Sequence, residues 1–180
     1  MKVFEVLPDE GRFQMIGDAG FAKKYPRTNA KNRLFANWET LSLPVDDPSK
    51  ARGDFLFFPL EYLVCAAEVN DAYAECVCGD VQVLPVRIQD DPAPYVFWNT
   101  VNYVDALDTE KTTYRAPPFR SLPRDWVFKP SALSRPMLFH DIRLPMILLV
   151  VTFGQASNDF YGQYQKRRAK GLRFKLLWEQ

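Results

Sequence analysis

Histidine and glycine are scarce in this sequence, and the motifs that depend on them are missing. The 180 residues include one histidine and eight glycines. Glycine lets backbone N–H groups approach a bound phosphate, and histidine serves as a metal ligand or a general base. The chain contains neither G-x-G-x-x-G nor G-x-x-x-x-G-K-S/T, and neither G-x-S-x-G nor H-E-x-x-H. These gaps favour a protein that acts through its surface, so we expect no enzyme, no metal and no cofactor.

The sequence also lacks an excess of charge and a long apolar run. Its 23 basic and 22 acidic residues leave a net charge of +1, so no overall field attracts nucleic acid or an anionic membrane. The longest apolar run, residues 146–153, is far shorter than the roughly 20 residues of a membrane span. The first residues carry no secretory signal. We therefore expect a cytoplasmic protein that binds neither a membrane nor nucleic acid.

Cysteine is present only as Cys65, Cys76 and Cys78. The C-x-C pair lacks the two-residue gap of zinc knuckles and redox motifs. Two of the three, Cys65 and Cys76, fall within one predicted helix, where small buried thiols are common. We expect core thiols of the kind that suit a reducing compartment, with no role in metal binding or redox chemistry.

The predicted elements indicate an α+β fold in a single domain, residues 1–180. A chain of this length buries about 70% of its unfolded surface, which is enough for one core. Apolar alternation and buried runs favour a mixed or largely antiparallel sheet with two principal helices. The expected strands are 3–7 with 13–16 as a hairpin partner, 53–59, 81–88, 95–108, 126–129, 137–142, 146–153 and 172–178. Turns or loops are expected at 89–94 and 109–121.

Residues 1–52 form an N-terminal portion, which lies outside the stretch 53–178 and has a weak pattern from residue 17 onward. Basic side chains alternate there with the aromatic residues Phe21, Tyr25, Phe35 and Trp38. Such interleaving can bind single-stranded nucleic acid. The balanced net charge favours an irregular segment whose aromatic side chains pack on the core while its charges remain in water. The basic residues concerned are Lys23, Lys24, Arg27, Lys31 and Arg33.

The first helix is predicted over residues 60–76, with Gly79 as its left-handed stop. Its polar residues are spaced by 7, 3 and 4, which places them on one stripe of a helix. These carboxylates invite an acid/base interpretation, but no histidine, nucleophile or metal ligand accompanies them. A solvated acidic stripe is the better interpretation. Its members are Glu61, Glu68, Asp71 and Glu75.

The second helix is expected before Gly171, with Ser157 as its N-cap and Asp159 in its first turn. Basic residues crowd residues 166–175 at its end. This cluster could bind nucleic acid. A favourable interaction with the helix dipole and a solvent-exposed strand face explain the same basic residues without a ligand. His140 beside Asp141 likewise suggests a general base. Neighbours on a strand point to opposite faces, however, so the two side chains cannot easily touch.

The stretch 95–108 is predicted to be the centre of the fold. Large apolar side chains fall on both of its faces, so we expect a central strand covered on both sides, with a bulge or bend near residues 99–102. Asp105 and Asp108 follow it and favour a turn. No partner group accompanies them that would suggest catalysis.

Four ordered segments of the chain resemble the Imm11 family of bacterial immunity proteins. Residues 95–111 resemble its centre, Y-x-x-x-N-x-x-x-x-x-D-x-L-D-x-E, except that Thr112 stands where the family often has serine. Three shorter segments agree in order and spacing. They are Gly53-Asp54-Phe55, Leu84-Pro85-Val86 and Lys170-Gly171-Leu172-Arg173-Phe174. The resemblance covers residues 53–178, and the proline-rich loop 114–136 departs from it.

The resemblance implies an immunity protein of a polymorphic toxin system, which binds a cognate toxin domain in the bacterial cytoplasm and neutralises it. The shared motifs are typical of structural positions, so no partner-binding residue carries over from the family. Two other functions remain open at this point. One is a small enzyme or ligand-binding domain that uses the acidic stripe, His140 and the aromatic residues of 95–108. The other is a nucleic-acid-binding domain that uses residues 166–175. The sequence leaves the oligomeric state open.

Overall fold

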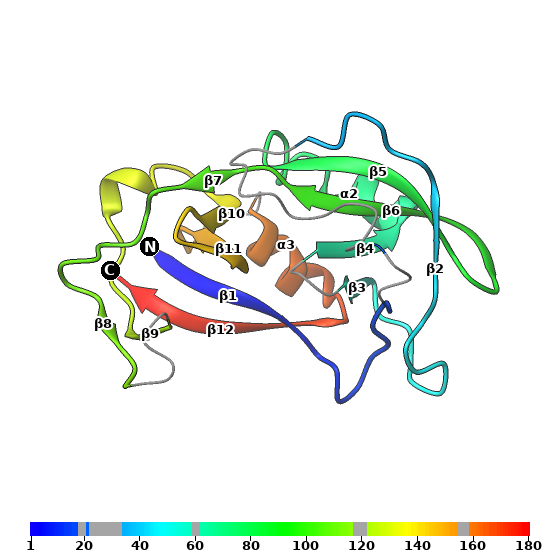
Figure 1. The fold of residues 1–180 in the computed structure, drawn as a ribbon, viewed down its shortest axis with the longest axis horizontal. Helices are drawn as coiled ribbons and strands as arrows, with labels where there is room; N and C mark the ends of the chain where they lie inside the picture. The colour runs from blue at the N-terminus through cyan, green and yellow to red at the C-terminus, as the bar shows by residue number, and fades with distance from the viewer. Residues whose placement is uncertain (18–20, 22–33, 59–61, 117–121, 155–158) are drawn as a thin grey trace.

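Strands make up most of the protein. A computed structural model describes residues 1–17, 21, 34–58, 62–116, 122–154 and 159–180. In these residues, ten strands form two five-stranded sheets, and two more form a small hairpin (Figure 1). The expected α+β class holds only loosely, because helices are few and the sheet is divided in two.

Sheet I contains both ends of the described chain, in the strand order β12-β1-β11-β10-β7. All its neighbours are antiparallel except β7 and β10. The N-terminal amine donates to the carbonyl oxygen of Gln180 at 2.7 Å, and the two termini lie side by side in Figure 1. Its strands are β1 (Lys2–Pro8), β7 (Tyr103–Val104), β10 (Met137–Asp141), β11 (Leu144–Thr152) and β12 (Leu172–Glu179).

Sheet II has the strand order β2-β5-β6-β4-β3, and only the β2–β5 pair is parallel. Its strands are β2 (Leu41–Leu43), β3 (Phe55–Phe58), β4 (Tyr62–Ala66), β5 (Val81–Ile88) and β6 (Asp91–Thr100). The remaining elements are α2 (Ala67–Tyr73), α3 (Phe160–Arg167), the 3-10 turn η1 (Pro130–Ala132), and the hairpin strands β8 (Thr113–Tyr114) and β9 (Pro123–Asp125).

Strand β6 and its continuation connect the two sheets, and β6 is the central, doubly covered strand that the stretch 95–108 predicts. It lies between β4 and β5 in sheet II and is covered on both faces, because Phe97 and Trp98 are both fully buried on opposite sides. The chain leaves the ladder after Thr100 and enters sheet I at Tyr103 (Figure 1). The bend expected near residues 99–102 is therefore the crossing between the sheets.

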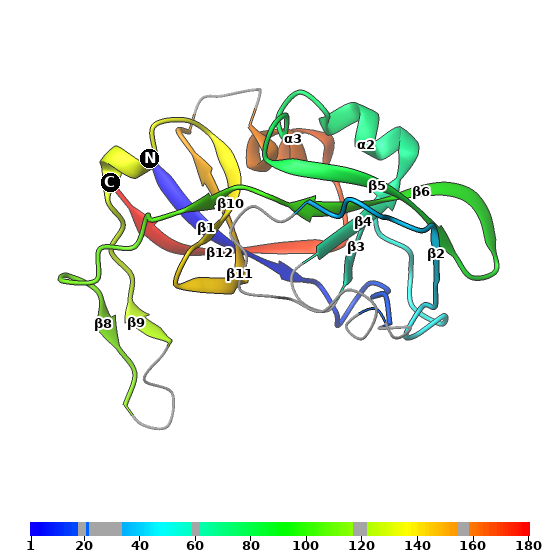
Figure 2. The same cartoon turned by 45° about the horizontal axis from the view of Figure 1, so that its top comes forward.

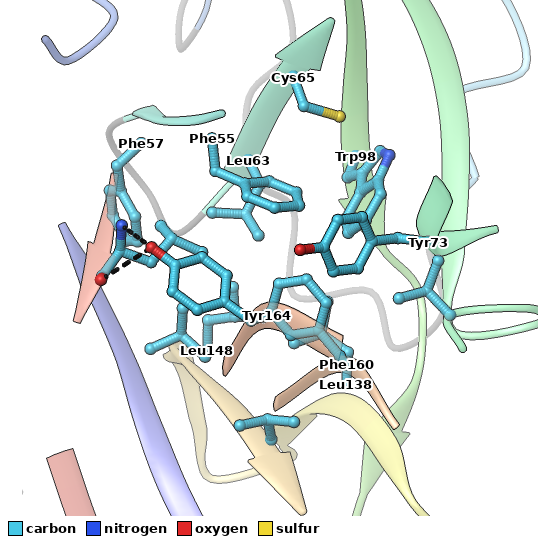
Figure 3. Close-up of a cluster of buried hydrophobic side chains, with 14 of the residues drawn as sticks. Phe55, Phe57, Leu63, Cys65, Tyr73, Trp98, Leu138, Leu148, Phe160 and Tyr164 are labelled. Atoms are coloured by element: carbon cyan, nitrogen blue, oxygen red, sulfur yellow. Dashed lines mark hydrogen bonds between the residues drawn. The ribbon is translucent and has the colours of Figure 1, made fainter. Parts of the chain in front are cut away.

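The apolar side chains of the described residues form three clusters, one between the sheets and one on each outer face. The cluster between the sheets also receives α2 and α3, and its aromatic rings meet edge to face (Figure 3). Residues 34–45 and Phe21 cover the outer face of sheet II, and residues 104–107 and 126–133 cover the outer face of sheet I. Each ring contact stabilises the fold by about 0.5–1.5 kcal/mol beyond the effect of the apolar area that it buries.

The prediction for residues 60–76 is wrong in its first half. Residues 62–66 form strand β4, and α2 has only seven residues. The run Tyr62 to Cys65 is fully apolar and pairs with β3 on one side and β6 on the other. A short apolar run fits a buried strand as well as a helix, and the tertiary pairing decides. Cys65 therefore lies on a strand, and Gly79, with a φ of 79°, lies in the turn that follows α2, six residues beyond the end of that helix.

Three smaller predictions also need correction. Residues 13–16 form isolated bridges to residues 45, 51 and 57 instead of a hairpin with β1. Strand β6 begins at Asp91, within the expected turn 89–94. The strand expected at 126–129 lies earlier, at β9. In the N-terminal portion, Lys23, Lys24, Tyr25, Arg27, Lys31 and Arg33 lie outside the described residues.

Helix α3 has its N-cap two residues after the predicted one and its C-terminal stop three residues before the predicted one. Ser157 lies outside the described residues, and the N-cap is Asp159, whose side chain accepts from the N–H of Gly162 at 2.5 Å. Arg168 takes the left-handed conformation at the C-terminus, with a φ of 55°. Gly171 instead has a φ of 108°, and a Cβ there would lie 1.8 Å from the carbonyl oxygen of Phe55. Glycine is required because two backbones meet at this point.

Candidate interaction surface

His140 and Asp141, the neighbours that could suggest a general base, are both buried. His140 is 1% exposed, its Nδ1 lies 2.9 Å from the carbonyl oxygen of Ile147, and its ring lies 5.1 Å from that of Tyr103. Asp141 points to the opposite face of β10, as alternation requires. Its Oδ2 accepts from the N–H groups of Ala106 and Leu107 at 2.9 and 2.7 Å. The pair therefore holds backbone in place and is not assembled as a catalytic dyad.

Asp80 is a second buried carboxylate that serves the fold. It accepts from the N–H of Leu138 at 2.9 Å and from Asn102 Nδ2 at 3.1 Å, and Arg135 forms an ion pair with it. Burial raises the pKa of its carboxyl group, and these donors act in the opposite direction. These contacts join Asp80, which lies at the end of the turn before β5, to strand β10. Asp80 thus ties sheet II to sheet I at the crossing.

Asp105 and Asp108 shape the turn after β7, as the sequence indicates. Asp105 pairs with Arg143 and with Lys129, and these hydrogen bonds lower the pKa of its carboxyl group to about 2. Asp108 Oδ1 accepts from the N–H groups of Glu110 and Lys111 at 3.2 and 3.3 Å. This local pattern is that of an aspartate turn.

The acidic stripe lies beside a polar hollow between α2 and α3. Two adjoining hollows, of about 290 and 180 Å³, share Ala72 and Arg167. Glu68, Asp71 and Glu75 line them, and Glu61 lies outside the described residues. Burial raises the pKa of the Cys76 thiol in the larger hollow to about 11. That thiol stays protonated at neutral pH, so it is a poor nucleophile and a poor metal ligand.

The other two cysteines differ in their exposure to solvent. Cys65 is buried, and burial raises the pKa of its thiol, whereas Cys78 is exposed. In the described part of the chain, no group of three or more His, Cys, Asp or Glu side chains is placed to hold a metal ion. Among the same residues, no helix has the length and apolar content needed to cross a bilayer.

The basic cluster 166–175 is divided by the fold. Arg167 lies over the ring of Tyr73 at 5.7 Å, and Arg173 donates from Nε to the carbonyl oxygen of Pro8 at 3.1 Å. Lys175 pairs with Glu5 at 3.2 Å on the outer face of sheet I. The cluster therefore does not form one continuous patch along a groove, which is what binding to a nucleic-acid backbone requires.

A groove on the outer face of sheet I has the composition of a protein-binding surface. We call it the hairpin groove, because the β8–β9 hairpin forms one wall and strands of sheet I form the other. Its volume is about 280 Å³. The hairpin projects away from the body beside the chain termini in both ribbon views (Figures 1 and 2). The lining residues are Glu5, Arg115, Leu122, Pro123, Arg124, Trp126, Ile147, Lys175, Leu176 and Leu177.

The base of the hairpin is fixed to the body. Thr112 Oγ1 donates to the carbonyl oxygen of Val127 and accepts from its N–H, both at 3.2 Å. Higher up, Thr113 Oγ1 donates to Asp125 Oδ2 at 2.6 Å. Trp126 lines the groove while its ring stacks on the buried Phe128 at 5.8 Å. These contacts hold the wall in a defined position, which reduces the entropy lost on binding.

Apolar side chains and positive charges are exposed around this groove. Leu176 is 47% exposed, Tyr114 is 40% exposed, and Leu122 is 36% exposed. Arg115, Arg124 and Lys175 outnumber the single lining carboxylate, Glu5. Tyrosine, tryptophan and arginine are enriched at the energetic centres of protein interfaces. The groove is suited to an acidic protein segment that carries apolar side chains.

Little in the amino-acid sequence indicates this surface. Residues 109–121 read only as a polar loop, and the wall that faces them comes from β1, β11 and β12, over 20 residues away in the chain. One signal was present, because Leu122 and Trp126 are large apolar residues in a proline-rich loop. No family model matches this sequence, and no curated protein shows a significant match to it.

Proposed function

We propose that this protein is an immunity protein that binds a cognate bacterial toxin domain and neutralises it by direct contact. The observation that carries the proposal is the hairpin groove, which combines exposed apolar side chains, a tryptophan in its wall and more arginine and lysine than acidic residues. The buried carboxylates Asp80 and Asp141, by contrast, are engaged in holding the backbone. The resemblance to the Imm11 family supplies the class of partner.

The segments that carry this resemblance meet in pairs inside the fold. The N–H of Phe55 donates to the carbonyl oxygen of Lys170 at 3.1 Å, and the N–H of Lys170 donates to Asp54 Oδ2 at 2.7 Å. In sheet II, residues 84–86 pair with residues 95–97. These positions serve the scaffold. The hairpin lies in the loop 114–136 that departs from the family pattern, and a partner-specific surface is expected to vary in this way.

The two other functions have less support. The polar hollow beside α2 contains a protonated thiol and no histidine, so it lacks an activated nucleophile and a base. The basic residues 166–175 are directed to different parts of the surface. Neither arrangement favours an enzyme or a nucleic-acid-binding domain over a protein-binding one.

Co-expression with a neighbouring toxin tests the proposal. A toxin encoded immediately upstream should stop the growth of a bacterial host, and this protein should restore growth when both are produced. The variant Arg115→Glu reverses one charge in the groove and should restore growth less well than Lys166→Glu, which makes the same charge change outside it. Growth that this protein does not restore, with both proteins shown to be produced, would contradict the proposal.

A further inference from the structure

Strand β12 is one of the two edge strands of sheet I and borders the hairpin groove. It pairs with β1 on one side, and no strand in the described part of the chain pairs with its other side. Residues 175–177 of this strand line the groove. A strand of this length with an open edge presents unpaired N–H and C=O groups to which another strand can add.

The hydrogen bonds at the start of β12 show which backbone groups face outward. Gly171 accepts from the N–H of Asp9, so its carbonyl group faces β1. Both the N–H and the carbonyl oxygen of Leu172 contact the hydroxyl group of Tyr164 instead, at 2.9 and 3.1 Å, and therefore face away from β1 (Figure 3). Directions alternate along a strand. The N–H and C=O groups of Phe174 and Leu176 therefore point to the open edge. The register of β12 against β1 shifts after Leu176.

The side chains beside this edge define what could pair with it. Lys175, Arg115 and Arg124 give the groove its positive charge, and Leu176, which also lines the groove, is 47% exposed. The side chains of an added strand would alternate between its two faces. Carboxylates opposite the basic residues and an apolar side chain beside Leu176 would complement this surface.

A second copy of this chain is a poorer occupant of the edge. Pairing of two β12 strands would bring Arg173 and Lys175 of one copy near the same residues of the other, and like charges opposite each other are destabilising. Basic side chains on an edge strand are a common protection against such self-pairing. The same charges attract an acidic strand.

We propose that the toxin contributes a β-strand that adds to residues 174–179 of β12, with acidic side chains directed into the hairpin groove. This inference rests on the proposed function and specifies how the partner is held. The main-chain hydrogen bonds at Phe174 and Leu176 provide much of the contact, and the groove selects the acidic face of the added strand.

Hydrogen exchange of the full-length protein, free and mixed with the product of the adjacent toxin gene, tests this mode of binding. The N–H groups of Phe174 and Leu176 should exchange readily in the free protein and at least about 100-fold more slowly in the complex. Those of Arg173 and Lys175 face β1, so they should be protected in both states and serve as the internal control.

A proline variant provides the second measurement. Leu176→Pro removes an outward N–H and leaves the hydrogen bonds to β1, so the variant should fold and bind at least about tenfold more weakly. Leu176→Ala keeps the N–H and should lose less affinity. A complex without protection at 174 and 176 would overturn this inference alone, as would formation of a homodimer through β12. A wild-type protein that does not bind the toxin would overturn the proposed function as well.

Discussion

At the scale of single residues, the charged groups that first suggest chemistry are those that hold the turns. Asp141 and Asp80 are each fully buried, and each accepts backbone N–H groups. A buried carboxylate is stable only when such donors compensate for its lost hydration. The sequence indicated this role for Asp105 and Asp108, because both follow a strand and precede polar residues. The sequence could not indicate this structural role for Asp80, because the hydrogen-bond partners of its carboxylate lie 22 to 58 residues away in the chain.

The ion pairs of Asp105 predict a pH-dependent stability. The folded pKa of its carboxyl group, about 2, lies below the unfolded value of 3.8, so its contribution is complete above about pH 4 and is lost as the pH falls toward 2. Asp105→Asn should lower the urea midpoint slightly at pH 7, and the difference from wild type should shrink at pH 3. The exposed Glu110→Gln serves as the control. An equal difference at both pH values would contradict this account of the pairing.

At the scale of elements, the strands with a clear apolar pattern were predictable and the pairings were not. Leu84, Val86 and Ile88 share one buried face of β5, and residues 148–152 of β11 are buried, whereas Met146 near the start of that strand is exposed. Residues 62–66 were assigned to a helix because the acidic residues after them have helical spacing. Only β3 and β6, which lie on either side, make that segment a strand. Short apolar runs are ambiguous for this reason.

Phe97 tests the structural role of the central strand. Its side chain is fully buried in sheet II, and its ring lies 4.7 Å from that of Tyr62 and 5.7 Å from that of Phe58. Phe97→Ala should lower the free energy of unfolding by about 3–5 kcal/mol, because it leaves a cavity. Val83→Ala, at a 44% exposed position on β5, should cost less than about 1 kcal/mol. Urea denaturation at neutral pH measures both, and similar losses would contradict the central position of Phe97.

At the scale of the whole molecule, the two joined sheets form a scaffold, and the hairpin groove lies on the surface of this scaffold. Segments far apart in the sequence, such as 53–55 and 170–172, come into backbone contact and join the two sheets. The hairpin then projects from this scaffold beside β12 (Figure 2). The general class of the fold could be inferred from the sequence. The groove could not, because its walls come from five separate parts of the chain.

The affinity of the protein for the product of the adjacent toxin gene tests the central claim most directly. In calorimetric titration, wild type should bind with a dissociation constant below about 1 μM. Arg115→Glu should bind at least about tenfold more weakly, because it places a negative charge opposite an acidic partner. Lys166→Glu, outside the groove, should bind as wild type does. Equal affinity of wild type and Arg115→Glu, or no binding by wild type, would contradict the claim that this protein neutralises a toxin through the hairpin groove.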